Sequence, residues 1–227
     1  MRLRSWFVEP TVTGVGVLDK AVRVLAAIEH RPLDLGGLVA ATGLPRATAH
    51  RLAVALEAHG LVRRDDRGRF VPGLRLVALG RAASSALALP EVAGPALEEL
   101  REQTGESVQL YVREGSVRVC VASLESPHGL RTIVALGASL PLPAGSAGRI
   151  LAGEDPTQDA WTQSVGEREP GVASVSAPVR DDQGEVVAAV SVSGPIDRMG
   201  DAPGPRHGPA VAAAAQRIEA DLNGRAD

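Results

Sequence analysis

The sequence predicts an α+β protein in which a small helical domain precedes a larger α/β domain built on an antiparallel sheet. Three observations carry this prediction. Apolar residues recur every three or four positions within residues 15–60, as they do on amphipathic helices. From residue 106 onward they alternate with a period of two, which is typical of strands. The third observation is the distribution of charge. Residues 14–81 contain 11 Lys and Arg and 6 Asp and Glu, whereas residues 82–227 contain 11 Lys and Arg and 20 Asp and Glu.

This segregation of charge is typical of a chain whose basic end binds a polyanion. The alternative is that the charges lie on solvated surface and are unevenly distributed by chance. Composition narrows the class further. The 227 residues, 44% apolar and 22% charged, suit one large or two small globular domains. No apolar run approaches the ~20 residues of a bilayer span and the start lacks a signal peptide, so we expect a cytoplasmic protein without a membrane partner. Cys120 is the only cysteine, which excludes an internal disulfide and a thiolate zinc site.

Three helices are predicted first. Residues 15–29 form an amphipathic helix with an apolar stripe of Val17, Leu18, Val22, Leu25 and Ile28. A short second helix, 35–42, is capped by Asp34 and ended by Gly43. The third begins at Pro45 and runs to Gly60, with Ala49, Leu52, Ala53 and Leu56 turned inward. Helix, short break with a glycine, helix is the helix-turn-helix outline.

A basic hairpin is predicted directly after the third helix. Its strands are 61–64 and 69–71, and Asp65 and Gly68 supply turn residues between them. A helix-turn-helix followed by such a wing is typical of DNA-binding domains. Residues 74–87 then read as a helical linker, and Pro90 marks a boundary.

The second domain is predicted to begin with a helix over 95–104. Strands follow at 107–113, 117–123 and 131–136, then a helix at 146–152, a strand pair at 172–179 and 186–193, and a final helix near 209–222. Antiparallel strands with helices between them define an α/β domain on an antiparallel sheet.

Several segments of the chain resemble the IclR family of bacterial transcription regulators, in order over residues 14–223. They are 18–21 (LDKA), 42–52 (TGLPRATAHRL), 60–62 (GLV), 140–142 (LPL), 145–152 (GSAGRILA) and 188–195 (AAVSVSGP). Residues 14–21 and 164–179 are more narrowly similar to the actinobacterial NdgR-like branch, which is associated with amino-acid biosynthesis.

The resemblance implies a winged helix-turn-helix DNA-binding domain at 14–73, a helical linker at 74–88, and a GAF-like effector-binding and oligomerisation domain at 89–227. It implies a homodimer or homotetramer on a double-stranded DNA operator. A small organic effector, such as a keto acid, another carboxylate or an amino acid, is the implied input, with neither a metal nor a cofactor. The sequence leaves open whether the regulator activates or represses transcription.

The candidate DNA-binding residues lie on the outer start of the third helix and in the wing. Arginine and histidine donate to base edges and phosphates, alanine can touch a thymine methyl, and threonine can bond a phosphate. Arg51 has an alternative, a pair with Glu29 or Glu57. The set is Arg46, Ala47, Thr48, His50, Arg51, Arg63, Arg64, Arg67 and Arg69.

The candidate effector-binding residues are carried over from the family pocket: Leu140, Ser146, Ala147, Ser174, Ser191 and Ser193. Serine hydroxyls and free N–H groups near Ser146 would suit a carboxylate, and the alternative is that these serines only fill a tight sheet face. Glu167 and Glu169 are candidates for selecting an amino group. Residues 153–160 are shorter than the family's segment, which predicts a pocket that is open or non-functional. The C-terminal domain would then only oligomerise.

An enzyme is not expected. Ser146 could pair with His128 or His207 as in a hydrolase, but the chain has no Gly-x-Ser-x-Gly elbow. It also has no phosphate loop and no paired-histidine metal motif. Cys120 lies in an alternating strand and is expected to pack in the core.

Overall fold

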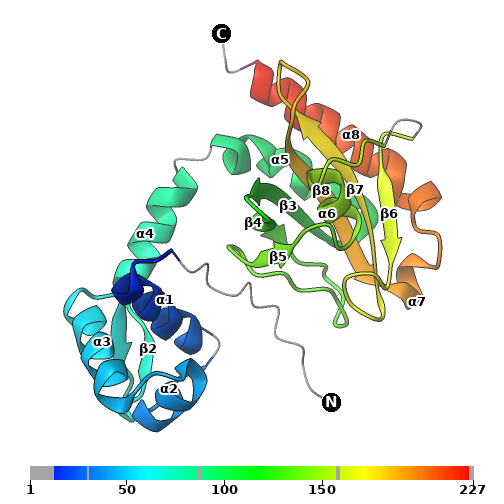
Figure 1. Ribbon diagram of the computed structural model, residues 1–227. Helices are drawn as coiled ribbons and strands as arrows, with labels where there is room; N and C mark the ends of the chain where they lie inside the picture. The colour runs from blue at the N-terminus through cyan, green and yellow to red at the C-terminus, as the bar shows by residue number, and fades with distance from the viewer. Residues whose placement is uncertain (1–12, 30, 86–87, 157–158, 225–227) are drawn as a thin grey trace. The chain divides into compact units, whose positions relative to one another are not determined.

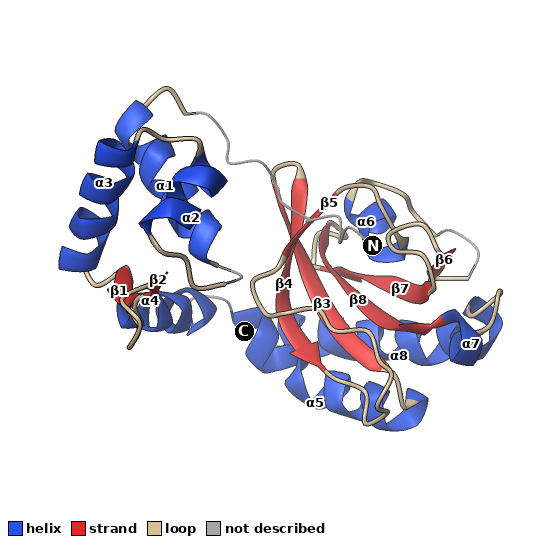
Figure 2. Cartoon of the chain, turned by 90° about the horizontal axis from the view of Figure 1, so that it is seen from below, coloured by secondary structure: helices blue, strands red, loops and turns tan. Residues whose placement is uncertain are grey.

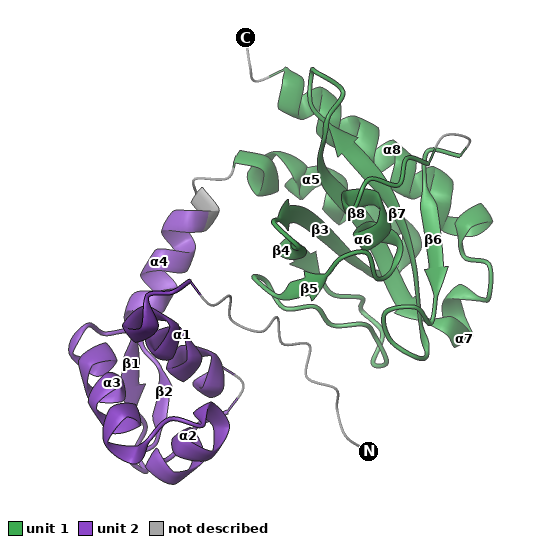
Figure 3. Ribbon diagram, in the orientation of Figure 1, with its two compact units in different colours: residues 1–8, 87–227 green, residues 9–86 purple. Residues whose placement is uncertain are grey.

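The computed structural model describes residues 13–29, 31–85, 88–156 and 159–224. These residues form two compact units, one up to residue 85 and the other from residue 88 onward (Figure 3). Each unit has its own hydrophobic core. The α+β organisation predicted from the sequence is confirmed.

The first unit is a helix-turn-helix with a wing, followed by one more helix (Figure 1). Its elements are α1 (Gly16–Ile28), α2 (Leu35–Thr42), α3 (Arg46–Ala58), β1 (Val62–Arg64), β2 (Phe70–Pro72) and α4 (Leu74–Ser85). The helix boundaries follow from local chemistry. Asp34 caps α2 by accepting a hydrogen bond from the backbone N–H of Gly37 at 2.7 Å. Gly43 ends the helix at a φ of 66°, a conformation that glycine adopts without a steric penalty.

The wing is a two-stranded antiparallel hairpin, as predicted. Asp65 shapes its turn by accepting hydrogen bonds from the backbone N–H groups of Arg67 (3.0 Å) and Arg69 (2.9 Å). Phe70 of β2 is buried beside α1 and α2, and so anchors the wing in the helical core.

The predicted apolar stripe of α1 is wrong in part. Val17, Leu18 and Val22 are 66%, 52% and 41% exposed, whereas Val24 and Ile28 are buried. The core of this small domain reaches only one side of the helix, with Ala21 and Leu25 completing the buried face. Apolar residues lie on two sides of α1, and composition alone did not distinguish them.

The helix that opens the second unit, α5 (Ala88–Thr104), begins earlier than predicted. Pro90 lies in the first turn of this helix, where a missing N–H has no helical partner to lose, so the boundary predicted there falls close to the start of the second unit. Pro95 lies inside the helix and is exposed. The buried Val92 and Ala93 hold this first half of the helix on the core, and packing outweighs the loss of one helical hydrogen bond.

The second unit is one six-stranded antiparallel sheet, in the order β5-β4-β3-β8-β7-β6, with helices on both faces. Figure 2 shows α5 and α8 on one face and α6 on the other. The elements are β3 (Ser107–Glu114), β4 (Val117–Leu124), β5 (Ser139–Pro141), α6 (Ser146–Leu151), β6 (Thr162–Val165), β7 (Val172–Arg180), β8 (Val186–Pro195), α7 (Ile196–Met199) and α8 (Gly204–Asn223).

The strand predicted at 131–136 is absent from the described residues. Its alternation is real, because Thr132 and Val134 are buried while Ile133 is exposed. Serine side chains take the place of a strand partner: Ser107 Oγ donates to the carbonyl of Thr132, and Ser123 Oγ to that of Val134, both at 2.7 Å. The final helix also begins earlier than predicted, at Gly204, and α7 was not predicted.

Candidate functional site

The outer face of α3 carries the predicted base-reading side chains. Arg46, Ala47, His50 and Arg51 are exposed, and Thr48 is half-buried at the edge of the helix face. The side chains of Arg46, His50 and Arg51 form no hydrogen bond or ion pair with any residue that the structure describes. The alternative pairing of Arg51 with Glu29 or Glu57 is therefore not made; Glu57 instead faces Arg64.

The four wing arginines fall into two groups. Arg63 and Arg67 are exposed, and their side chains form no ion pair with a described residue. Arg64 contacts Glu57 (Nε to Oε2, 3.4 Å) and stacks 4.4 Å over the Phe70 ring. Arg69 binds Asp65 (Nε to Oδ2, 2.8 Å), and this hydrogen bond lowers the pKa of the Asp65 carboxyl. Arg63 and Arg67 are thus free for another partner, while Arg64 and Arg69 also stabilise the wing.

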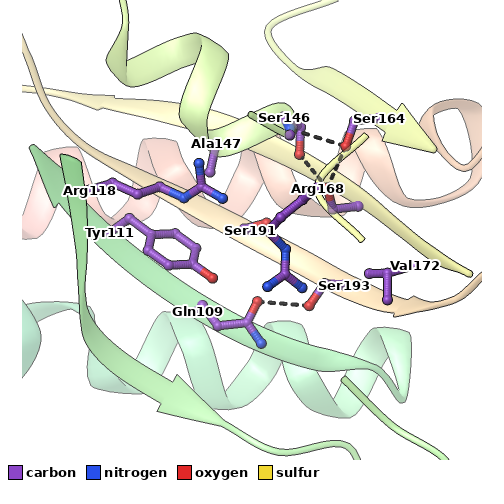
Figure 4. Close-up of a pocket in the computed structure, with 12 residues that line it drawn as sticks. Gln109, Tyr111, Arg118, Ser146, Ala147, Ser164, Arg168, Val172, Ser191 and Ser193 are labelled. Carbon is purple, nitrogen blue, oxygen red and sulfur yellow. Dashed lines mark hydrogen bonds between the residues drawn. The ribbon is translucent and has the colours of Figure 1, made fainter. Parts of the chain in front are cut away.

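A small polar cavity lies between α6 and the sheet in the second unit (Figure 4). Five of the six predicted effector residues line it together: Ser146, Ala147, Ser174, Ser191 and Ser193. The sixth, Leu140 of β5, packs in the apolar cluster that also holds Ala147, and it does not line the cavity. Residues from α6, β7 and β8 are brought together here because β7 and β8 are neighbouring strands and α6 covers them.

Serine hydroxyls on this face bond to one another. Ser146 Oγ lies 2.7 Å from the hydroxyls of both Ser174 and Ser176, and Ser174 Oγ lies 3.0 Å from that of Ser164. Ser176 Oγ donates to Ser191 Oγ at 2.8 Å. The N–H of Ser146, expected to be free, donates to Ser164 Oγ at 3.2 Å. The serines therefore form a continuous network, and only part of their hydrogen-bonding capacity remains for a ligand.

Two arginines also line the cavity, and the sequence prediction did not include them. Arg118 of β4 is 3% exposed and donates to the carbonyls of Pro141 (3.2 Å) and Ala144 (2.6 Å). Burial lowers the pKa of its guanidinium. A signal was present, because the alternation of β4 puts residue 118 on the same face as Cys120.

Arg168 belongs to the loop between β6 and β7, and its guanidinium points into the cavity (Figure 4). Its side chain is 13% exposed, and its ion pair is with Glu169, at 3.6 Å. No periodicity places a loop residue, so the sequence carried no signal for it. Other lining residues absent from the prediction are Gln109, Tyr111, Gly145, Ser164 and Val172.

The cavity is nearly filled by its own walls. It has a volume of about 20 Å³, which is room for about one water molecule. The two glutamates predicted as possible amino-group ligands do not line it: Glu167 pairs with Arg149 at 2.9 Å, and Glu169 with Arg168. Of the short segment 153–160, residues 157–158 lie outside the described residues.

A helix-turn-helix whose outer face carries cationic side chains without an ion pair to any described residue, followed by a wing, defines a DNA-binding transcription regulator. The comparison with known families agrees. Residues 17–66 match the IclR helix-turn-helix domain, and residues 81–159 and 154–220 match the C-terminal domain of bacterial IclR regulators. The chain belongs to the IclR family.

Known relatives cover most of the chain. The transcriptional regulator KipR of Bacillus subtilis is 28% identical over a 210-residue alignment, and the match covers 77% of this chain and 84% of KipR. The glycerol operon regulatory protein of Streptomyces griseus is also 28% identical, covering 78% of this chain and 83% of its own. An IclR homolog from Microbacterium hydrocarbonoxydans, solved in complex with 4-hydroxybenzoate, is similar in structure, with a TM-score of 0.77, 25% identity and coverage of 93% and 100%.

Among the described residues, no single helix is long and apolar enough to span a bilayer, and only the bent pair Leu74–Ala83 and Ala88–Thr104 has sufficient length and hydropathy when its two helices are combined. No group of three His, Cys, Asp or Glu side chains in the part of the chain that the structure describes is placed to hold a metal ion.

Proposed function

We propose that this protein binds a double-stranded DNA operator through α3 and the wing, within residues 14–73, and releases or tightens its hold when a small acid enters the cavity of the second unit. The observation that carries the DNA-binding part is the exposed face of α3. Arg46, His50 and Arg51 are on its surface without an ion pair to any described residue, as base-reading side chains must be before DNA is present. A regulator of this kind works in the cytoplasm, where its operator is.

The effector class we propose is a carboxylate, keto acid or amino acid. Support comes from the polar lining of the cavity and from the structural relative that was solved with 4-hydroxybenzoate, itself a carboxylic acid. For target genes we propose amino-acid metabolism, on the similarity of residues 14–21 and 164–179 to the NdgR-like branch. Genome-wide mapping of bound sites tests this assignment, because the genes beside those sites identify the regulated pathway.

We further propose that the regulator acts as a homodimer or homotetramer. Helix-turn-helix proteins of this kind read paired half-sites through a two-fold axis. Large apolar side chains on α1 and α4 are exposed in the single chain, and a second copy would cover them. They are Val17 (66%), Leu18 (52%), Leu74 (74%), Val77 (60%) and Leu79 (50%).

A second candidate function is supported by the cavity itself. Because it holds about 20 Å³ and its serines bond to one another, the C-terminal domain could act in oligomerisation alone and bind no effector. Two measurements on the full-length protein separate the candidates. Fluorescence anisotropy with genomic duplexes tests DNA binding, and a thermal-shift screen of keto, hydroxy and amino acids tests effector binding, since a ligand of the folded state raises Tm. Intact DNA binding with no Tm change for any acid would favour the oligomerisation-only candidate.

A further inference from the structure

The cavity between α6 and the sheet has hydrogen-bond donors to spare. The Nε atom of Arg118 and the Nε2 atom of Gln109 are buried and have no hydrogen-bond partner in the described structure. Ser193 Oγ donates to Oε1 of Gln109 at 2.9 Å, which occupies the amide oxygen and leaves the amide hydrogens unused. Buried donors without an acceptor destabilise a protein, so such a pair in one cavity indicates that an acceptor belongs there.

The serine network leaves one more donor. Each hydroxyl has a single hydrogen, and Ser176 uses its own toward Ser191. Ser146 must then donate to Ser176, Ser174 to Ser146, and Ser164 to Ser174, because each contact needs one hydrogen. This chain of four hydrogen bonds ends at Ser191, whose hydrogen remains unassigned. Ser191 lines the cavity, so its hydroxyl is a hydrogen-bond donor available to a ligand there.

The charge of the lining is of one sign. Arg118 and Arg168 both face the cavity, and none of the described residues that line it has a carboxylate. The charge of Arg168 adds to burial in lowering the pKa of Arg118, as expected for two cations held close together. Acceptors within the lining are neutral hydroxyl and amide oxygens, which hold an ammonium group less well than a carboxylate does.

We infer that the cavity selects a small dianion, a dicarboxylate, over a monocarboxylate or a zwitterionic amino acid, with one carboxylate held by Arg118 and Ser191 and the other by Arg168. This inference rests on the proposed effector-binding function and narrows its ligand class. The present volume is too small for such a ligand, so Arg168 must withdraw and then close over it. Its place on the loop between β6 and β7, with a single 3.6 Å ion pair to Glu169, permits that movement.

The test uses three acids of four carbons that differ in their charged groups: succinate has two carboxylates, butyrate has one, and aspartate has two carboxylates and an ammonium group. Calorimetry on the full-length protein should give a Kd for succinate about tenfold or more below that for butyrate, since a charged hydrogen bond is added. Aspartate should also bind about tenfold more weakly than succinate, because its ammonium group meets two arginines. Arg168→Gln should remove most of the preference for succinate over butyrate. Arg206→Gln, which removes an exposed arginine outside the cavity, should keep it.

The outcomes separate this inference from the function on which it rests. Equal affinity for succinate and butyrate, or an unchanged preference in Arg168→Gln, overturns the dianion inference and leaves a carboxylate effector possible. Binding of none of the three acids, with operator binding intact, overturns the dianion inference, whereas the effector-binding function is refuted only when the thermal-shift screen of keto, hydroxy and amino acids also finds no ligand. If the wild-type protein does not bind operator DNA, the proposed function as a transcription regulator is refuted.

Discussion

Individual arginines in the DNA-binding unit differ in what they are free to do. Arg46 and Arg67 are both exposed and unpaired with any described residue, but one begins α3 and the other lies in the wing turn. Arg69 has the same charge and yet is held by Asp65. The sequence assigned base contacts to the start of α3 and backbone contacts to the wing arginines, but a letter code does not show which arginine already has a carboxylate. Only the contacts in the structure distinguish an exposed, unpaired arginine from one that already binds a carboxylate.

Arg46→Ala should weaken operator binding by about 1 to 3 kcal/mol and relax sequence preference, because a base contact is lost. Arg67→Ala should weaken specific and random DNA alike and reduce the salt dependence, because a phosphate contact is lost. Anisotropy titrations of both duplexes at several salt concentrations measure these effects. An equal loss on both duplexes for Arg46→Ala would contradict the division of roles.

At the scale of elements, α8 approaches β6 closely through two glycines. A Cβ atom added to Gly204 or Gly208 would overlap the indole ring of Trp161, which is half-buried just before β6. The sequence predicted the strand pair β7 and β8 and the end of α8, but it placed the start of the helix at 209. The missed turn is the one that carries these glycines, because glycine is a poor helix former unless packing requires it.

Gly208→Ala should lower the free energy of unfolding by about 1 to 3 kcal/mol, as overpacking does in a close helix contact. Gly94→Ala is the matched control, since a Cβ there meets no atom within 4 Å and the residue lies inside α5. It should be neutral or stabilising by up to about 1 kcal/mol. Urea unfolding of both variants decides the matter, and equal stability of the two would rule out the close contact.

At the scale of the whole molecule, stability should depend on pH through His207 on α8. Its Nε2 atom is buried without a hydrogen-bond partner in the described structure, and burial lowers the pKa of the imidazole below 6.5. Between the folded-state pKa and 6.5, the unfolded chain binds the proton and the folded chain does not. Stability from the neutral imidazole is therefore complete above pH 6.5 and is lost as the pH falls below it.

Thermal unfolding from pH 7.5 to pH 5 measures this dependence. The Tm of the wild-type protein should fall more steeply with acid than that of His207→Gln, which has no group to protonate at this position. Parallel Tm curves for the two proteins would show that His207 does not contribute.

The sequence by itself determined the helical periods, the Asp34 cap, the wing turn and the strand alternation, because these depend on residues a few positions apart. With the family resemblance it also indicated five residues that line the cavity. Tertiary structure alone decided which side of α1 is buried, that residues 131–136 are held by serine hydroxyls, and that Arg168 enters the cavity. These features arise from packing between segments far apart in the chain, for which local pattern carries no information.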